Sequence, residues 1–260
     1  MFEAGLTLVE MLAAIALSGF IVLGIVAFAQ LAEDSFTTER KTTEAVCAAR
    51  ACFQQIENAV DQAWANEQFP GAIVVPQSVA GNYLPETLVV WCPSTGQPRD
   101  PNGLPYLDEL IVFAVNDSRP NELRKYRFTT GSTVAPNPSD LGAWQTLIGT
   151  LKNQSPGESQ VLTDRLRTFV INTRVCGAVR FRIDLAPGDS EWNDTSIPWN
   201  SLSWPQGLFG PTRGTRRVSV HTEIQLQKLT SSESSQQEGS YVFWYSRAFA
   251  YSVRKELRPQ

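Results

Sequence analysis

The chain has 260 residues, with 22 lysines and arginines against 26 aspartates and glutamates, which gives a net charge of -4. This balance provides no strongly basic surface for phosphates, so nucleic-acid binding is not expected. After an N-terminal segment of about 60 residues, the length leaves room for one globular domain of ordinary size.

Residues 6–32 carry a single charged residue, Glu10. A helix of about 20 apolar residues is long enough to cross a bilayer. A carboxylate within hydrocarbon is costly unless a cation neutralises it, so Glu10 is expected to bind a positive group. A conventional secretory signal has its small residue after the apolar core, whereas Gly5 precedes the core here.

The string Ala4-Gly5-Leu6-Thr7-Leu8-Val9-Glu10 resembles the class III signal of type IV prepilins and type II secretion pseudopilins. In that family a membrane peptidase cuts after the glycine and methylates the new N terminus. The resemblance implies cleavage between Gly5 and Leu6 and N-methylation of Leu6. It also implies that Glu10 guides assembly by neutralising the N terminus of a neighbouring subunit. The alternative is an ordinary N-terminal membrane anchor that happens to contain a glutamate.

Two features around this segment depart from the family pattern. Leu6 stands where the family usually has phenylalanine, a change that its peptidases are expected to tolerate. Residues 1–5 contain no lysine or arginine, while Arg40 and Lys41 follow the span. The positive-inside rule alone would not place this N terminus in the cytoplasm, so we expect a start codon further upstream to supply basic residues.

Residues 33–68 are expected to continue the helix as an amphipathic segment. After the polar string Glu33-Asp34-Ser35, apolar residues recur at helical spacing: Val46, Ala49, Phe53, Ile56, Val60 and Ala63 or Trp64. This spacing is typical of a helix with one buried stripe. We expect the helix to end before Phe69-Pro70-Gly71, and the resemblance to pilins implies that its apolar face packs on the sheet of the head.

Residues 69–260 are expected to form a β-rich head. The predicted strands are 88–91, 110–115, 123–128, 169–172, 179–185, 218–227 and 241–252. Apolar and polar residues alternate in 179–185 and 218–227, as in half-buried antiparallel strands. A long loop is expected over 187–211 and a mobile polar connector over 230–239. The predicted fold class is α+β and pilin-like, with a long N-terminal transmembrane and amphipathic helix packed on an antiparallel β-sheet head.

The aromatic residues near the C-terminus are Tyr241, Phe243, Trp244, Tyr245, Phe249 and Tyr251. They occupy both odd and even positions of the last predicted strand, which favours burial on both faces of that strand. The alternative is a recognition surface, because aromatic residues are enriched at interface hot spots.

The four cysteines, Cys47, Cys52, Cys92 and Cys176, are compatible with two disulfides in an exported protein. Three pairings are possible. Cys47 and Cys52 are five residues apart on the expected helix, where their side chains diverge, so each is expected to pair with a different head cysteine. Reduced, buried thiols are the alternative. A zinc site is disfavoured because the chain has no CxxC pair and one histidine, His221.

No enzymatic activity is expected. His221 lies on the polar side of a predicted strand with no nucleophile motif beside it. Asp108 and Glu109 could in principle serve glycoside hydrolysis, but they are interpreted as solvated loop residues. The only cofactor considered is calcium, with Asp184, Asp189, Glu191 and Asp194 as weak candidate ligands in one loop-rich stretch.

Spaced motifs in the head are similar to those of J-type minor pseudopilins and W-type minor pilins: Leu123-Arg124-Lys125-Tyr126-Arg127-Phe128, Val179-Arg180-Phe181-Arg182, Trp192, Trp204-Pro205 and Arg217-Val218-Ser219-Val220. The resemblance implies a minor pilin or pseudopilin subunit that assembles into a type II secretion pseudopilus or type IV pilus and initiates or caps it. A major structural pilin is one alternative. The other is a membrane-anchored periplasmic ligand-binding or hydrolase domain.

The same resemblance implies partners and a location. The expected partners are other minor and major pilins or pseudopilins, a prepilin peptidase and an inner-membrane assembly platform, without direct nucleic-acid contact. The protein is expected to span the bacterial inner membrane once, with its head in the periplasm, before it enters the filament.

Overall fold

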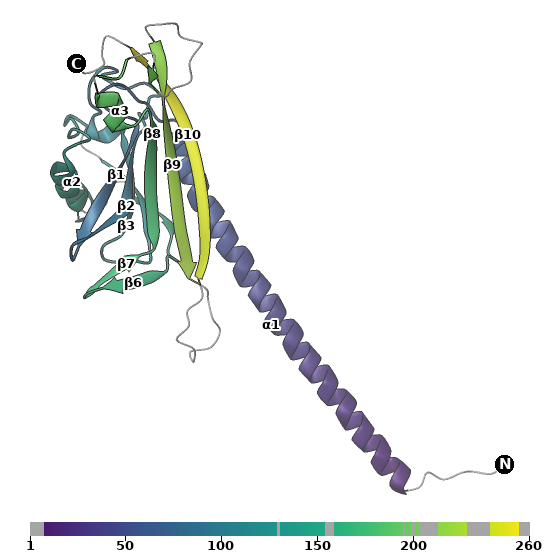
Figure 1. The fold of residues 1–260 in the computed structure, drawn as a ribbon. Helices are drawn as coiled ribbons and strands as arrows, with labels where there is room; N and C mark the ends of the chain where they lie inside the picture. The colour runs from purple at the N-terminus through teal and green to yellow at the C-terminus, as the bar shows by residue number, and fades with distance from the viewer. Residues whose placement is uncertain are drawn as a thin grey trace. The chain divides into compact units, whose positions relative to one another are not determined.

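The computed structural model describes residues 8–128, 131–153, 159–194, 196–198, 201–202, 213–227 and 240–254. The chain divides into an N-terminal unit, Met1–Val46, and a head unit, Cys47–Gln260. Helix α1, Leu8–Asp61, is one continuous helix of 54 residues that contributes to both units (Figure 1). Gly5, Leu6 and the connector at 230–239 lie outside the described residues.

In the N-terminal unit, α1 exposes its apolar side chains in all directions. Leu8 is 77% exposed and Phe28 is 74% exposed. An 18-residue window of the helix has a mean hydropathy of 2.6, and none of that window is buried. The helix is therefore long and apolar enough to span a membrane.

In the head unit, the last turns of α1 are amphipathic, as the sequence predicts. Four small or apolar residues at spacings of three and four are buried: Ala49, Cys52, Ile56 and Val60. This spacing places them on one face of the helix. The buried stripe of the second half of α1 is thus confirmed.

The helix ends at Asp61, earlier than the predicted limit just before Phe69. Beyond it, the backbone N–H of Trp64 donates to the carbonyl oxygen of Trp91 at 2.8 Å. The side-chain oxygen of Asn66 then accepts a hydrogen bond from the backbone N–H of Phe69 at 2.9 Å. These contacts satisfy backbone groups that would otherwise continue the helix.

The larger sheet has five antiparallel strands in the order β1-β2-β3-β4-β5. Its strands are β1 (Ala72–Val79), β2 (Asn82–Trp91), β3 (Leu110–Val115), β4 (Leu123–Arg127) and β5 (Ser159–Thr163), and a 3₁₀ turn, Leu107–Glu109, precedes β3. A two-residue turn joins β1 to β2, and both of its residues, Ala80 and Gly81, have positive φ. This is the twist that a tight hairpin requires.

Both faces of this sheet are covered. Helix α2, Leu141–Asn153, buries Trp144 and Ile148 in a cluster that includes Leu110 and Val112 of β3. The next residue of β3, Phe113, points to the opposite face. Phe113 pairs with Lys125 of β4, whose ammonium donates to Gln55 of α1 at 3.3 Å. The end of α1 therefore lies over the face opposite α2.

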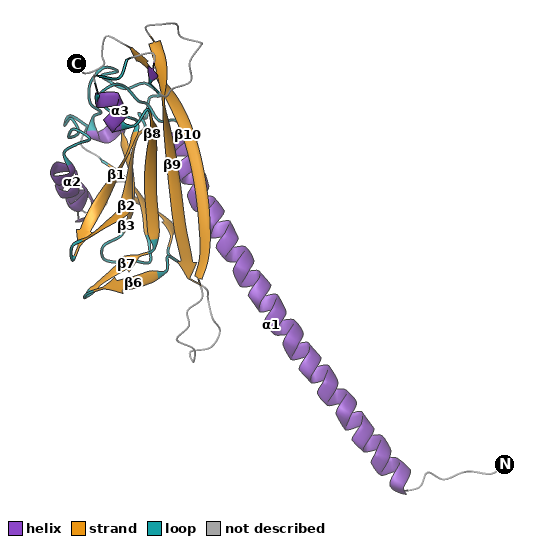
Figure 2. Ribbon diagram, viewed as in Figure 1, coloured by secondary structure: helices purple, strands orange, loops and turns teal. Residues whose placement is uncertain are grey.

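A second antiparallel sheet has the order β10-β9-β8, with β8 (Val179–Ala186), β9 (Arg213–Gln227) and β10 (Ser240–Arg254). The hairpin of β6 (Thr168–Ile171) and β7 (Arg174–Gly177) and the short helix α3 (Asp189–Asn193) complete the head. Figure 2 shows β10 as the outermost strand of its sheet.

The predicted α+β fold class is confirmed: a long N-terminal helix is combined with antiparallel sheets, in an arrangement compatible with a pilin-like fold. Each predicted strand is present, but β2 begins six residues and β9 five residues before the predicted start, whereas the bounds of the others differ by two residues or fewer. The sequence analysis missed α2, β1, β5 and β7. The predicted loop over 187–211 contains the helix α3, and residues 195, 199–200 and 203–211 lie outside the described part.

The prediction that the C-terminal aromatic strand is buried on both faces is wrong. Trp244 is 71% exposed and Val242 is also exposed, whereas Tyr241, Phe243 and Tyr245 are half-buried. The reason is the position of β10 at the edge of a sheet that is covered on one face only. A strand of a sheet that is covered on one face buries alternate residues at most.

Candidate functional site

The assembly residue named from the sequence, Glu10, lies in the first turn of α1. It is exposed, between the exposed apolar side chains of Val9 and Met11. A carboxylate in this position is favoured by the positive end of the helix dipole. Gly5 and Leu6 lie outside the described residues, so cleavage between them and methylation of Leu6 stay predictions.

The second half of α1 is joined to β10 by an aromatic and a charged contact. The rings of Phe53 and Tyr245 are stacked, with their centroids 5.3 Å apart. The guanidinium of Arg247 binds both carboxylate oxygens of Asp61, at 2.7 and 2.9 Å, and lies 3.4 Å from Glu57. Burial raises the pKa of Tyr245 to about 12. These contacts, two turns apart on one helix face, fix α1 against the last strand.

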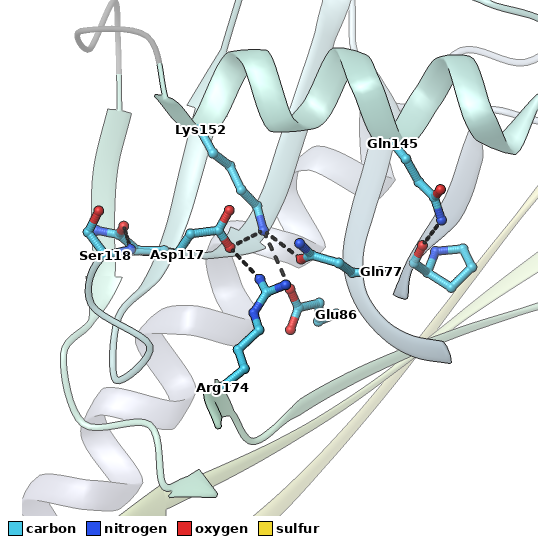
Figure 3. Close-up of polar contacts among 9 residues, drawn as sticks. Gln77, Glu86, Asp117, Ser118, Gln145, Lys152 and Arg174 are labelled. Carbon is cyan, nitrogen blue, oxygen red and sulfur yellow. Dashed lines mark hydrogen bonds and ion pairs between the residues drawn. The ribbon is translucent and has the colours of Figure 1, made fainter. Parts of the chain in front are cut away.

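A second cluster of charged residues lies at the C-terminal end of α2 (Figure 3). The ammonium of Lys152 is 3.2 Å from Asp117 and 3.5 Å from Glu86. The side chains of Lys152 and Glu86 are only 2% and 4% exposed. Arg174 of β7 binds the same oxygen of Asp117 at 3.1 Å. Two cations thus face two anions.

The cluster also includes two amide side chains. Gln145 of α2 donates to the carbonyl oxygen of Pro76 at 2.7 Å. Gln77 lies between Lys152, Glu86 and Arg174, and with its amide nitrogen turned toward Glu86 its oxygen accepts from Arg174 at 2.9 and 3.1 Å. A cavity of about 220 Å³ adjoins these residues.

Burial raises the pKa of Glu86, and the nearby charge of Lys152 opposes that rise. Lys152 and Glu86 are both buried, and buried charges are stable only when they are paired, so each of these two depends on the other. The arrangement ties α2 to the β1–β2 hairpin, to the turn after β3 and to β7. The sequence analysis missed it because its residues are scattered over almost a hundred positions with no local motif.

The four cysteines that the sequence analysis considered for disulfides are free thiols in this structure. Cys47 is exposed, and the other three are buried. Burial raises the pKa of the Cys52 thiol to about 12. The thiol of Cys92 lies 3.7 Å from the side-chain oxygen of Gln62. Disulfide pairing therefore stays a prediction.

The weak calcium candidates are distributed over two elements. Asp184 is on β8, Asp189 and Glu191 are in α3, and Asp194 follows α3. Asp184 pairs with His221 at 3.1 Å, and Asp189 pairs with Arg216 at 2.6 Å. Among the described residues, no group of three or more histidines, cysteines, aspartates or glutamates is close enough to hold a metal ion.

The interpretation of Asp108 and Glu109 as solvated loop residues needs correction. Glu109 is 5% exposed and its carboxylate accepts hydrogen bonds from the Trp91 indole at 3.0 Å and from the Arg99 backbone at 2.7 Å. Asp108 pairs with the side chain of Arg99. Glu109 is buried because these donors satisfy its carboxylate.

A hollow of about 460 Å³ is lined by residues of β8, β9 and β10, and two others lie elsewhere on the described surface of the head. The larger, about 790 Å³, lies beside α3 and is lined in part by Glu67, Trp192, Arg216 and Tyr251. The smaller, about 400 Å³, lies between the start of β2, the β6–β7 hairpin and β8.

The comparisons with known proteins leave these features without a named relative. No family model, no curated protein and no solved structure matches the chain.

Proposed function

We propose that this protein is a membrane-anchored minor pilin or pseudopilin subunit, processed between Gly5 and Leu6, which initiates or caps a helical filament. The observation that carries the proposal is that the two parts of α1 differ in exposure. Its first part is apolar, exposed and headed by Glu10, whereas its last turns are buried in the head.

The physical argument starts from the exposed part. A helix that is apolar on all sides is stable only in a bilayer or among other apolar helices. A charged residue near the start of such a helix raises the free energy of the helix in a bilayer unless a cation neutralises it. In a filament, the N terminus of a neighbouring subunit supplies that cation, and heterologous contacts of one subunit with the next generate an open helical assembly.

The head supports an assembly role of this kind. Its two sheets hold the end of α1 through contacts with Gln55, Phe53 and Asp61, so the end of the helix is fixed to the head. We propose a location in the bacterial inner membrane, with the head in the periplasm, before assembly. Other pilin-like subunits, a prepilin peptidase and an inner-membrane platform are the proposed partners.

The proposal is tested by crosslinking and mass spectrometry on native membranes that contain the wild type, Glu10→Gln or Glu10→Asp. We expect links to other pilin-like chains in the wild type and about tenfold fewer with Glu10→Gln, which corresponds to ~1.4 kcal/mol. Glu10→Asp keeps the charge and is expected to retain most links. Equal links in all three, or none to pilin-like chains, would contradict the proposal.

A further inference from the structure

The hollow of about 400 Å³ between β2, the β6–β7 hairpin and β8 combines an apolar wall with a basic rim. Its apolar wall includes Leu84 and Pro85 of β2, Phe169 of β6 and Val179 of β8, and Arg167 and Arg180 lie beside them. We name these six residues the arginine groove. Three apolar side chains of the adjoining β6–β7 hairpin, Phe169, Val170 and Val175, are exposed. An exposed apolar patch of this kind is typical of a binding surface.

The two arginines lie opposite two different positions of β9. The backbone N–H of Arg167 donates to the carbonyl oxygen of Gln225, and Arg180 of β8 lies opposite Glu223 in the register of the two strands. These β9 positions are two residues apart, or about 7 Å along a strand. Glu223 is the one acid in the wall among the described residues, and it accepts a hydrogen bond from Gln225 at 3.2 Å. The rim is therefore net positive.

A matching surface occurs on α1 in the N-terminal unit. Phe36 is 71% exposed although it follows the end of the apolar run. Glu33 precedes it by three residues and Glu39 follows it by three, so all three share one face of the helix. The two carboxylates are about 9 Å apart along the axis. An aromatic ring between two acids is complementary in charge and spacing to an apolar groove between two arginines.

We propose that the arginine groove binds the Glu33-Phe36-Glu39 face of α1 from a second copy of this chain. Phe36 would enter the apolar hollow, and the two glutamates would face Arg167 and Arg180. The contact joins two different surfaces, so it is heterologous and repeats from one copy to the next. The inference rests on the proposed function, because it names the contact by which one anchored subunit docks on another.

The test uses two full-length, differently tagged copies in the same membranes. The first copy carries a photo-crosslinking residue at position 36, and the second copy carries the groove. We expect a product that joins the two tags and maps to peptides containing Phe169 or Val179. The matched control places the probe at Thr38, two residues further and on the other side of the helix, where little product is expected.

Charge reversal makes the test specific. Arg180→Glu in the second copy is expected to lower the crosslink yield about fivefold, since a favourable pair becomes a repulsive one. Glu33→Arg in the first copy is expected to restore it. Arg182→Glu, an exposed position on the same strand, serves as the control and is expected to leave the yield unchanged.

Several results would overturn the inference: links from position 36 to lipid, to a different protein or within one copy only, and a yield that Arg180→Glu does not lower. The crosslinks that wild-type and Glu10→Gln chains form with other pilin-like chains are measured in the same membranes. If Glu10-dependent links to pilin-like chains persist while the position 36 product is missing, the groove inference fails and the proposed function stands. If the Glu10-dependent links are missing, the proposed function fails.

Discussion

The N-terminal unit and the head unit differ in the burial of their apolar side chains. The head buries its apolar groups in layers between α2, the sheets and the end of α1, and buried charged groups such as Glu86 and Glu109 are paired or hydrogen-bonded within the chain. The N-terminal unit leaves a long apolar helix exposed. The difference teaches that the head is stabilised by its own contacts, whereas the first part of α1 requires surroundings that the chain itself does not provide.

The largest effect is expected from breaking the charged cluster. Lys152→Met should lower the free energy of unfolding of the head by about 3–5 kcal/mol, because Glu86 then remains buried without its cation. Denaturant unfolding in detergent, followed by tryptophan fluorescence, measures the change. Lys41→Met in the N-terminal unit is the control, with less than about 0.5 kcal/mol expected. A double variant, Lys152→Met with Glu86→Leu, should lose less than Lys152→Met alone.

The same substitution on the two parts of α1 sharpens the comparison. Ile56→Ala removes a fully buried side chain and should cost about 2–5 kcal/mol of head stability. Ile25→Ala removes an exposed one and should leave head unfolding unchanged. Similar unfolding midpoints for the two variants would contradict the division of α1.

A smaller effect is expected at the aromatic contact between α1 and β10. Phe53→Leu keeps an apolar side chain but loses the stacking on Tyr245, and should cost about 1 kcal/mol. Phe28→Leu, in the exposed part, is the control for the same measurement. Hydrogen exchange should also increase in β10 with Phe53→Leu and not with Phe28→Leu.

The smallest effect is a pH dependence from Glu86. Its pKa is raised in the folded head by burial, so the folded state binds its proton more tightly than the unfolded state. The Glu86 contribution to stability therefore falls as pH rises from about 4.5 through the raised pKa. Glu86→Gln should remove this decline. Unfolding measured between pH 4.5 and 7 tests the sign, and a wild-type curve that rises more steeply than the variant would contradict it.

The sequence predicts the elements that carry a periodic signal. The buried stripe of α1 and the alternation in β8 and β9 correspond to structure because burial on one face leaves a period in the residues. The hairpin turn at Ala80 and Gly81 was missed because alanine rarely adopts the positive φ found there. Helix α2 was missed because its glycines and threonines weaken its helical pattern.

The site is predictable only in part, for a different reason. Glu10 is recognisable because a lone charge in an apolar run is unusual. By contrast, Glu86, Asp117, Lys152 and Arg174 form a cluster only after four elements have packed together. The exposure of Trp244 depends equally on the packing of the sheets, since the face of β10 that carries Trp244 is left uncovered. Tertiary arrangement decides such features, and single-sequence patterns do not contain it.

The central claim is that this chain is processed and assembled like a pilin, and its N terminus is the most direct test. Intact-mass and N-terminal peptide analysis of the protein from native membranes should show a chain that starts at N-methylated Leu6. Blocking the cut with Gly5→Leu should leave the leader attached and prevent assembly. A wild-type chain that retains Gly5, or one cut after residue 32, would contradict the account.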